Sequence, residues 1–327
     1  MSLVSMLFDG FQLDPLFYKC PLNKPVGVPR PYWGLYFLIS GGITLLLYIP
    51  CIIAIASHDH MKTAAYKTML VLGFYDISST LIHSIATGFL GYYGITFCNY
   101  PRTIFALGAL GLTSWMGCCI SSMTLAVIRI CDINPQLRVR TLFEGDKIFL
   151  WLVLFLAYGF YAGCFTKPVI FTPTYMSWFF DPMLGGNPEN FINLAHTGNN
   201  ILMAICTTLF YSYLCYIVLT GSQLPETESR KLSGMQITII SQTFLFCIFH
   251  TIGAVLYAYM QFFSAPEYLI LMGQITWQLT SVSVCLVYLT LNRTIRRSVT
   301  RMVLPKCLCK GSQVDVVQRM SISQTGL

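Results

Sequence analysis

Residues 101–132 read PRTIFALGALGLTSWMGCCISSMTLAVIRICD, and the rest of the chain is organised around them. It has no Asp, Glu, Lys, Arg or His between Arg102 and Arg129, and as an α-helix it would rise roughly 40 Å. That length covers the hydrocarbon core of a bilayer and predicts a tilted spanning helix in the middle of a bundle. Small residues within it predict close approach of neighbouring helices. They are Gly108, Ala109, Gly111, Ser114, Gly117, Ser121 and Ser122.

The composition of the whole chain agrees with a membrane protein. Charged residues make up 10% of the 327 residues and hydrophobic residues 55%, whereas a soluble domain carries about a quarter charged residues. The first 20 residues lack a basic segment followed by an apolar core, so we expect no cleaved signal peptide. The net charge of +7 does not indicate nucleic-acid binding, because the basic residues gather on one side of the predicted membrane.

Six further apolar stretches flank the central one, so the sequence predicts an all-α membrane protein with a seven-transmembrane helix bundle. The predicted spans are 33–57, 66–93, 101–131, 148–170, 194–220, 237–263 and 268–291. Residues 1–32 precede the bundle as an extracellular segment, and residues 292–327 follow it in the cytoplasm. With the N-terminus outside, 15 of the 20 Lys and Arg residues fall on the inner side, as the positive-inside rule requires.

The segment after the last span has basic residues at helical spacing. Arg293, Arg296, Arg297 and Arg301 predict a short amphipathic helix that lies along the anionic inner leaflet. Cys307 and Cys309 follow it and are candidates for palmitoylation, with unmodified cytosolic thiols as the equal alternative.

Most of the 13 cysteines lie inside apolar runs, where a cysteine acts as a small hydrophobe. Cys20 and Cys98 fall outside the predicted spans on the extracellular side, where the compartment is oxidising. We therefore expect a disulfide between them.

The spans resemble those of G-protein-coupled receptors. In the second span LGFYD ends in Asp76, which matches the mid-membrane Asp of rhodopsin-like receptors. Arg129 matches the arginine of their Asp-Arg-Tyr motif, although Ile128 and Ile130 replace its neighbours. Tyr288 in VCLVY matches the tyrosine of the Asn-Pro-x-x-Tyr motif, although Val and Cys replace its Asn and Pro. The likeness to this broad class is partial.

A closer resemblance is carried by several blocks in order. RPYWGLYFLISGGITLLLYIP, YKTMLVLGFYDIS, IATGFLGYYG, FCNYPRTIFALG and MSWFFDP, within residues 30–182, resemble the class T serpentine chemoreceptor family of nematodes. The resemblance implies a seven-transmembrane receptor of the plasma membrane, with chemosensory use in a sensory cilium and coupling to a G protein. It does not identify a ligand.

Six residues in the middle or outer half of the spans are candidates for a ligand cavity that is mostly apolar with a few polar points. They are His83, Trp115, His250, Gln274, Trp277 and Gln278. Alternatively, each of these six residues has a structural role, in packing or in hydrogen bonds between helices. Because no ionisable residue is clearly placed to pair with a charged ligand, we expect an uncharged small molecule.

Four residues are candidates for switching and coupling. Asp76 is costly in a bilayer, so it is either a protonation-linked or ion-linked switch or a structural hydrogen-bond acceptor for Ser or Thr on adjacent helices. Arg129 can pair with Asp132 one turn away and be released toward a partner, or it can extend to lipid headgroups. The resemblance adds Tyr288 to this group.

These observations favour a receptor whose outer ligand shifts an equilibrium of helix arrangements and whose inner face selects a heterotrimeric G protein. A transporter would show internal repeats and paired broken helices, which the sequence lacks. A receptor-like partner subunit without signalling of its own stays open. His83, His250 and Asp76 are isolated in type and spacing, so we expect no catalytic residues, no metal site and no cofactor. The expected partners are a small-molecule ligand, a G protein and membrane lipids, and not nucleic acid.

Overall fold

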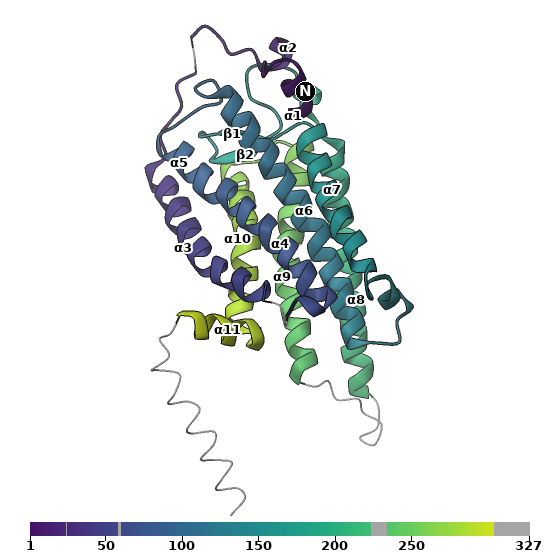
Figure 1. Ribbon diagram of the computed structural model, residues 1–327. Coiled ribbons are helices and arrows are strands. Elements are labelled where there is room, and N and C mark those ends of the chain that lie inside the picture. The colour runs from purple at the N-terminus through teal and green to yellow at the C-terminus, as the bar shows by residue number, and fades with distance from the viewer. Residues whose placement is uncertain (24, 58–59, 224–233, 304–327) are drawn as a thin grey trace, which may run out of the picture.

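Seven long helical stretches form a bundle in this computed structural model, which describes residues 1–23, 25–57, 60–223 and 234–303 (Figure 1). They are α3 (Pro31–Ile55), the continuous stretch of α4 (Ala64–Thr80), η2 (Leu81–Ala86) and α5 (Thr87–Tyr92), α6 (Pro101–Ile133), α7 (Lys147–Phe165), α8 (Leu194–Gln223), α9 (Gly234–Phe262) and α10 (Glu267–Thr290). Within the described residues, six of these stretches are long and apolar enough to cross a membrane, and α8 packs against α6 and α9 as the seventh. The predicted seven-helix architecture is confirmed.

Shorter elements join and cap the bundle. They are α1 (Leu3–Phe8), α2 (Pro15–Tyr18), η1 (His60–Lys62), η3 (Arg138–Leu142), the strands β1 (Ile170–Thr172) and β2 (Ser177–Phe179), η4 (Pro188–Phe191) and α11 (Arg293–Val303).

Helix α6 lies in the middle of the bundle, as its small residues predict. A Cβ atom at Gly117 would lie 2.3 Å from the ring of Tyr75 on α4, and one at Gly108 would lie 1.6 Å from the carbonyl oxygen of Val169. Because these separations are far below van der Waals contact, glycine at the two positions is what lets α4 and the segment before β1 pack directly on α6.

The ends of six predicted spans agree with the helices to within three residues, and the fourth does not. Its predicted range was 148–170, but α7 ends at Phe165, and Ile170 already belongs to β1. Pro168 explains the early end, because proline disfavours helical backbone at the residue before it and cannot donate a backbone hydrogen bond.

The second span contains a π-helical segment, η2, that the sequence did not predict. Such segments insert an extra residue into a helix and often occur at functional sites. Here the wider turn carries His83, whose side chain is fully buried, and Thr87 Oγ1 donates a hydrogen bond back to the Ile82 carbonyl (2.9 Å). The residues after η2 are thereby rotated relative to a regular α-helix.

A short antiparallel hairpin of β1 and β2 adds two strands to the predicted all-helical bundle. Phe171 pairs with Trp178 in its register, and both side chains are buried. The hairpin lies over the same end of the bundle as the N-terminus, where β1 packs on α5 and α6 and β2 packs on α10 (Figure 1). The Trp178 indole Nε1–H donates to Thr87 Oγ1 (2.8 Å), which fixes the hairpin to the second span.

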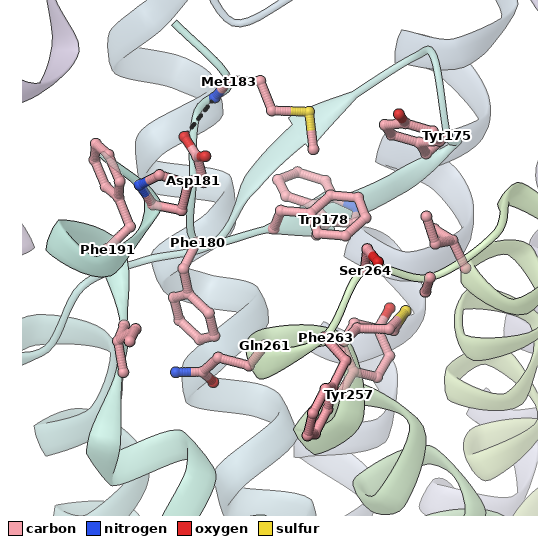
Figure 2. Close-up of a pocket in the computed structure, with 16 residues that line it drawn as sticks. Tyr175, Trp178, Phe180, Asp181, Met183, Phe191, Tyr257, Gln261, Phe263 and Ser264 are labelled. Carbon is pink, nitrogen blue, oxygen red and sulfur yellow. Dashed lines mark hydrogen bonds between the residues drawn. The ribbon is translucent and has the colours of Figure 1, made fainter. Parts of the chain in front are cut away.

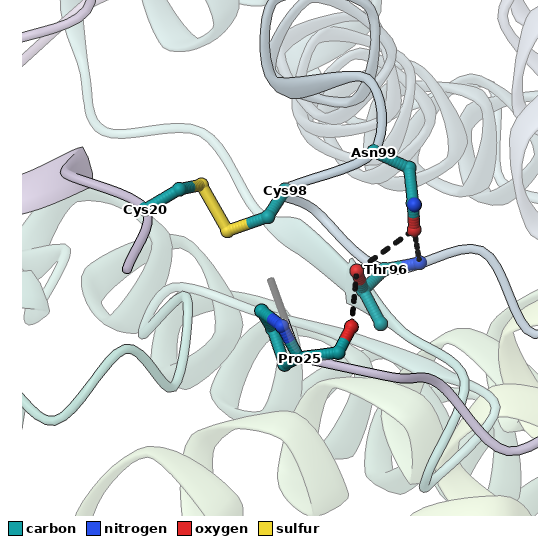
Figure 3. Close-up of a disulfide and its surroundings, with 5 residues drawn as sticks. All are labelled: Cys20, Pro25, Thr96, Cys98 and Asn99. Carbon is teal, nitrogen blue, oxygen red and sulfur yellow. Dashed lines mark hydrogen bonds between the residues drawn. A yellow bond between two sulfur atoms is a disulfide. The ribbon is translucent and has the colours of Figure 1, made fainter. Parts of the chain in front are cut away.

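The N-terminal segment is fastened to this end by a disulfide between Cys20 and Cys98, the pair that the sequence analysis proposes (Figure 3). Close to it, Thr96 Oγ1 donates to the carbonyl of Pro25 (3.4 Å) and to Asn99 Oδ1 (2.9 Å). The segment therefore has two attachments to the loop that connects α5 and α6.

Helix α11 lies across the opposite end of the bundle (Figure 1). Ile295 is its one buried residue, while Arg293, Arg296, Arg297 and Arg301 are exposed. Asn292 Oδ1 caps the helix by accepting the Ile295 N–H (3.1 Å). This two-sided helix matches the amphipathic segment that the sequence analysis expects, whereas Cys307 and Cys309 lie outside the described residues.

Candidate functional site

A pocket of about 300 Å³ lies at the end of the bundle that carries the N-terminus. Figure 2 shows the side chains that line it. We call it the outer pocket. It lies between β2 with the loop that follows and the turn from α9 to α10. Its volume is at the lower end of the range for small-molecule sites. It is lined by Tyr175, Trp178, Phe179, Phe180, Asp181, Met183, Pro188, Phe191, Ile192, Tyr257, Met260, Gln261, Phe263, Ser264, Ala265 and Ile270.

Seven of the sixteen lining residues are aromatic, and the N-terminal segment supports one of them. The ring of Phe191 meets Phe17 and Tyr18 edge to face, with centroids 6.1 and 6.0 Å apart. Burial, reinforced by the Asp14 carboxylate, raises the pKa of the Tyr18 phenol from its ordinary value, which is already well above physiological pH. The Cys20–Cys98 disulfide therefore holds in place the segment that packs against Phe191, one of the residues that line the outer pocket.

Below the outer pocket lies an inner cavity of about 20 Å³, enough for a single water molecule. Trp178 and Tyr257 line both spaces and separate them. The Tyr257 hydroxyl donates to Gln274 Oε1 (3.1 Å) and lies 3.4 Å from Ser177 Oγ. Movement of these two side chains would join the cavities.

Trp115 and Trp277, two of the six predicted ligand residues, line the inner cavity. Their indole nitrogens already have partners, since Trp115 Nε1–H donates to Asn200 Oδ1 (2.9 Å) and Trp277 Nε1–H donates to Ser79 Oγ (3.0 Å). His250 stacks on Trp115 with ring centroids 5.9 Å apart and is fully buried. These three side chains form an aromatic layer beneath the outer pocket.

The other three predicted ligand residues make hydrogen bonds between helices. Gln274 Nε2 donates to the His83 carbonyl (2.9 Å), and the His83 imidazole lies between Ser84 Oγ (2.8 Å) and Ser281 Oγ (3.3 Å). Gln278 Nε2 donates to Ser84 Oγ (2.8 Å) and to the Oγ of Ser40 on α3 (2.7 Å). None of the six predicted residues lines the outer pocket.

Asp76 lies in a separate layer at 0% exposure. Its Oδ2 accepts the Tyr48 hydroxyl (2.6 Å), and its Oδ1 accepts the Ser281 hydroxyl (3.1 Å) and the Cys118 thiol (3.5 Å). The Tyr48 ring packs on Tyr288, with centroids 5.9 Å apart. The contacts include the serine partner of the structural alternative, and they also join α4 to α3, α6 and α10.

At the opposite end, Arg129 is held between two neighbours. Its Nη1 lies 3.3 Å from Asp132 Oδ2, and its Nη2 lies 3.4 Å from Met69 Sδ. The Arg129 side chain is 15% exposed and that of Asp132 is 44% exposed. They line a cleft of about 500 Å³ that also contains Lys62, Lys67, Arg140, Glu144 and Asp146. We call it the charged cleft.

Sequence reasoning missed the residues that build the outer pocket and part of the layer beneath it. The aromatic run MSWFFDP contributes to the family resemblance, but nothing local in it indicates that Trp178 lines a pocket together with Tyr257. His196, Asn199 and Asn200 join the aromatic layer from α8, where Asn200 is the acceptor for Trp115. The sequence contains an indication of these residues, because the run HTGNN is unusually polar for the start of a membrane helix.

Seven membrane helices, an aromatic pocket at one end and a charged cleft at the other are the architecture of a serpentine receptor. Comparison with known proteins gives the family. The model for the serpentine type 7TM GPCR chemoreceptor Srt family matches residues 1–312, and the chain belongs to this family. Serpentine receptor class T-55 of Caenorhabditis elegans is 27% identical over 295 residues, which cover 89% of this chain and 80% of the relative.

Proposed function

We propose that the chain is a chemosensory receptor of the plasma membrane, in a sensory cilium, that binds a small molecule in the outer pocket and signals to a heterotrimeric G protein. The bias of Lys and Arg supports an extracellular N-terminus, which would open the outer pocket to the outside. Ligand binding then shifts an existing equilibrium between helix arrangements, by as much as its affinities for the two arrangements differ.

The observation that carries the proposal is a chain of hydrogen bonds that starts at the outer pocket. From the Tyr257 hydroxyl it passes through Gln274 (3.1 Å) to the His83 carbonyl (2.9 Å). The His83 imidazole continues it to Ser281 Oγ (3.3 Å), which donates to Asp76 (3.1 Å). A displacement of Tyr257 by a ligand would therefore alter the hydrogen bonds of Asp76. Side chains of four helices, α3, α4, α6 and α10, meet at that residue.

The receiving end is Arg129. Its contact with Asp132 is a single, part-exposed ion pair, and such pairs contribute about 1 kcal/mol or less. A shift of α6 relative to α4 would separate the guanidinium from Met69, and the ion pair with Asp132, which is on the same helix, can then open by a change of the Arg129 side-chain rotamer at small cost. The freed charge would then lie at the charged cleft, ready to meet a cytoplasmic partner.

The test is a calcium or cyclic-nucleotide reporter assay in cells that express the full chain with promiscuous G proteins. A panel of volatile and water-soluble small molecules is applied to the native chain, to Tyr257→Phe and to Tyr259→Phe. Tyr259→Phe is the matched control, because Tyr259 is on the same helix but 42% exposed and outside the outer pocket. Removing the Tyr257 hydroxyl should lower potency about fivefold through the lost hydrogen bond, with no change in the control.

Equal potency of the three chains at equal surface level would contradict the proposed route through Tyr257. A chain that reaches the surface and gives no response with any G protein would instead favour the partner-subunit alternative. Uptake of a panel compound without a reporter response would favour a transporter.

A further inference from the structure

We infer that the outer pocket selects a small organic cation, a protonated amine or a quaternary ammonium group, with Asp181 as its counter-charge. This inference rests on the proposed function, because it names the ligand class of the same pocket. It departs from the sequence-based expectation of an uncharged ligand. That expectation considered residues within the spans, and Asp181 lies in the loop after β2.

The lining of the outer pocket, as the structure describes it, carries one negative charge. Among its sixteen lining residues Asp181 is the one Asp or Glu, and none is Lys, Arg or His. Lys167 reaches the backbone beside the pocket, but its ammonium group donates to the carbonyls of Asn190 (2.6 Å) and Ile192 (3.5 Å) and is not part of the lining. The pocket therefore offers a negative charge that no lining residue neutralises.

The Asp181 carboxylate is held in place by one hydrogen bond and can accept further ones. Its Oδ1 accepts the backbone N–H of Met183 (2.8 Å), which is the side-chain contact of a tight turn (Figure 2). Within the described residues, Asp181 makes no other hydrogen bond and no ion pair. A half-buried carboxylate with one neutral donor can accept a further, charged donor without breaking the turn.

Aromatic rings line the same pocket as the carboxylate. Figure 2 shows Phe191 and Trp178 on either side of Asp181, with Phe180, Tyr257 and Phe263 lower in the view. The faces of such rings carry partial negative charge and attract cations, and groups of rings are a known means of binding quaternary ammonium. A neutral ligand of the same shape would gain the apolar contacts alone, and an anion would be repelled.

The alternative role of Asp181 is purely structural, and Asp181→Asn separates the two. Asparagine keeps the side-chain oxygen that accepts the Met183 N–H, and it is as common as aspartate in such turns. It removes only the charge. Glu267→Gln is the matched control, because Glu267 is an exposed acidic residue at the start of α10 and does not line the outer pocket.

The experiment measures equilibrium binding to the purified full chain in zwitterionic nanodiscs. The probes are phenethyltrimethylammonium and its uncharged carbon isostere, 3,3-dimethylbutylbenzene. The native chain and Glu267→Gln should bind the cation about tenfold more tightly than the isostere. In Asp181→Asn the two affinities should become equal within about threefold, because affinity for the cation falls and that for the isostere does not change.

Three results would overturn the inference. Equal affinities in the native chain would leave the outer pocket as a ligand site without a preference for cations, so the proposed function would survive. A preference that persists in Asp181→Asn would assign the selectivity to other residues. Failure of the cation to bind at about 1 mM would contradict the inference, and the reporter panel would still decide the proposed function independently.

Discussion

The two ends of the bundle differ in how they use charge. The outer pocket has one charged residue among sixteen lining residues and seven aromatic rings, whereas the charged cleft has seven charged residues among sixteen. An aromatic pocket of this size suits a small molecule that loses its hydration shell on binding. A cleft that contains charges of both signs suits the polar surface of a protein. The difference supports the proposed function, in which one end binds a ligand and the other meets a cytoplasmic partner.

Between the two ends lies a layer that belongs to neither. Asp76 is fully buried and accepts hydrogen bonds from three helices, while the pocket and the cleft both open to the surface. We therefore expect substitutions in the three regions to have graded effects. The loss in free energy of unfolding should be largest for substitutions in the buried layer around Asp76. It should be intermediate when the Cys20–Cys98 disulfide is removed, and smallest at the exposed ion pairs of the charged cleft.

The largest effect is expected for Asp76→Ala. The substitution leaves the hydroxyls of Tyr48 and Ser281 and the thiol of Cys118 without their acceptor, so the free energy of unfolding should fall by about 3 kcal/mol. Asp76→Asn keeps one acceptor oxygen and should lose about 1 kcal/mol. Thermal unfolding of the purified variants measures both, and a native midpoint for Asp76→Ala would show that the layer is not a stability centre.

An intermediate effect is expected when the Cys20–Cys98 disulfide is removed by the double substitution to Ser. The bond closes a loop across 78 residues, but most of that loop is membrane-spanning helix rather than flexible chain. We therefore expect a loss of about 2 kcal/mol, less than the roughly 4.5 kcal/mol for a flexible loop of this length. Binding to the outer pocket should weaken as well, because Phe191 loses its support from Phe17 and Tyr18.

Cys164→Ser is the control for this experiment, because Cys164 is a free cysteine on α7. Unfolding midpoints are measured without reductant, and addition of reductant should lower the native midpoint to that of the double variant. A double variant as stable as the control would mean that the N-terminal segment does not depend on the disulfide.

The smallest effect is expected for Arg140→Ala at the charged cleft. Arg140 Nε and Glu144 Oε1 are 3.0 Å apart, but the two side chains are 47% and 56% exposed. Solvent screens such a pair, so the free energy of unfolding should change by no more than about 0.5 kcal/mol. A loss as large as that of Asp76→Ala would contradict the ranking of the three regions.

The sequence predicted the bundle well because a membrane-spanning helix is a local property of composition. The apolar stretch after Arg102, with its glycines, was enough to identify α6 as the central helix, and the positions of Lys and Arg were enough to propose an orientation. The end of α7 was placed too late only because Val169 and Ile170 are apolar, although they follow Pro168.

The outer pocket could not be predicted because its residues meet only through tertiary contacts. Trp178 and Tyr257 are 79 residues apart in the chain, and each looks like ordinary packing in its own segment. The π-helical turn around His83 also has no strong local signal, yet it sets which residues of the second span face α10. Reasoning from single spans therefore chose the layer below the pocket, with Gln274 and Trp277, rather than the pocket itself.

Arg129→Ala separates the tasks of the two ends of the bundle and shows whether a signal passes between them. Ligand-evoked reporter signal and probe binding are measured together, at equal surface level, with exposed Arg138→Ala as the matched control. We predict that the signal falls below about a tenth of the native level while affinity at the outer pocket stays within about threefold. A native signal in Arg129→Ala would contradict the account.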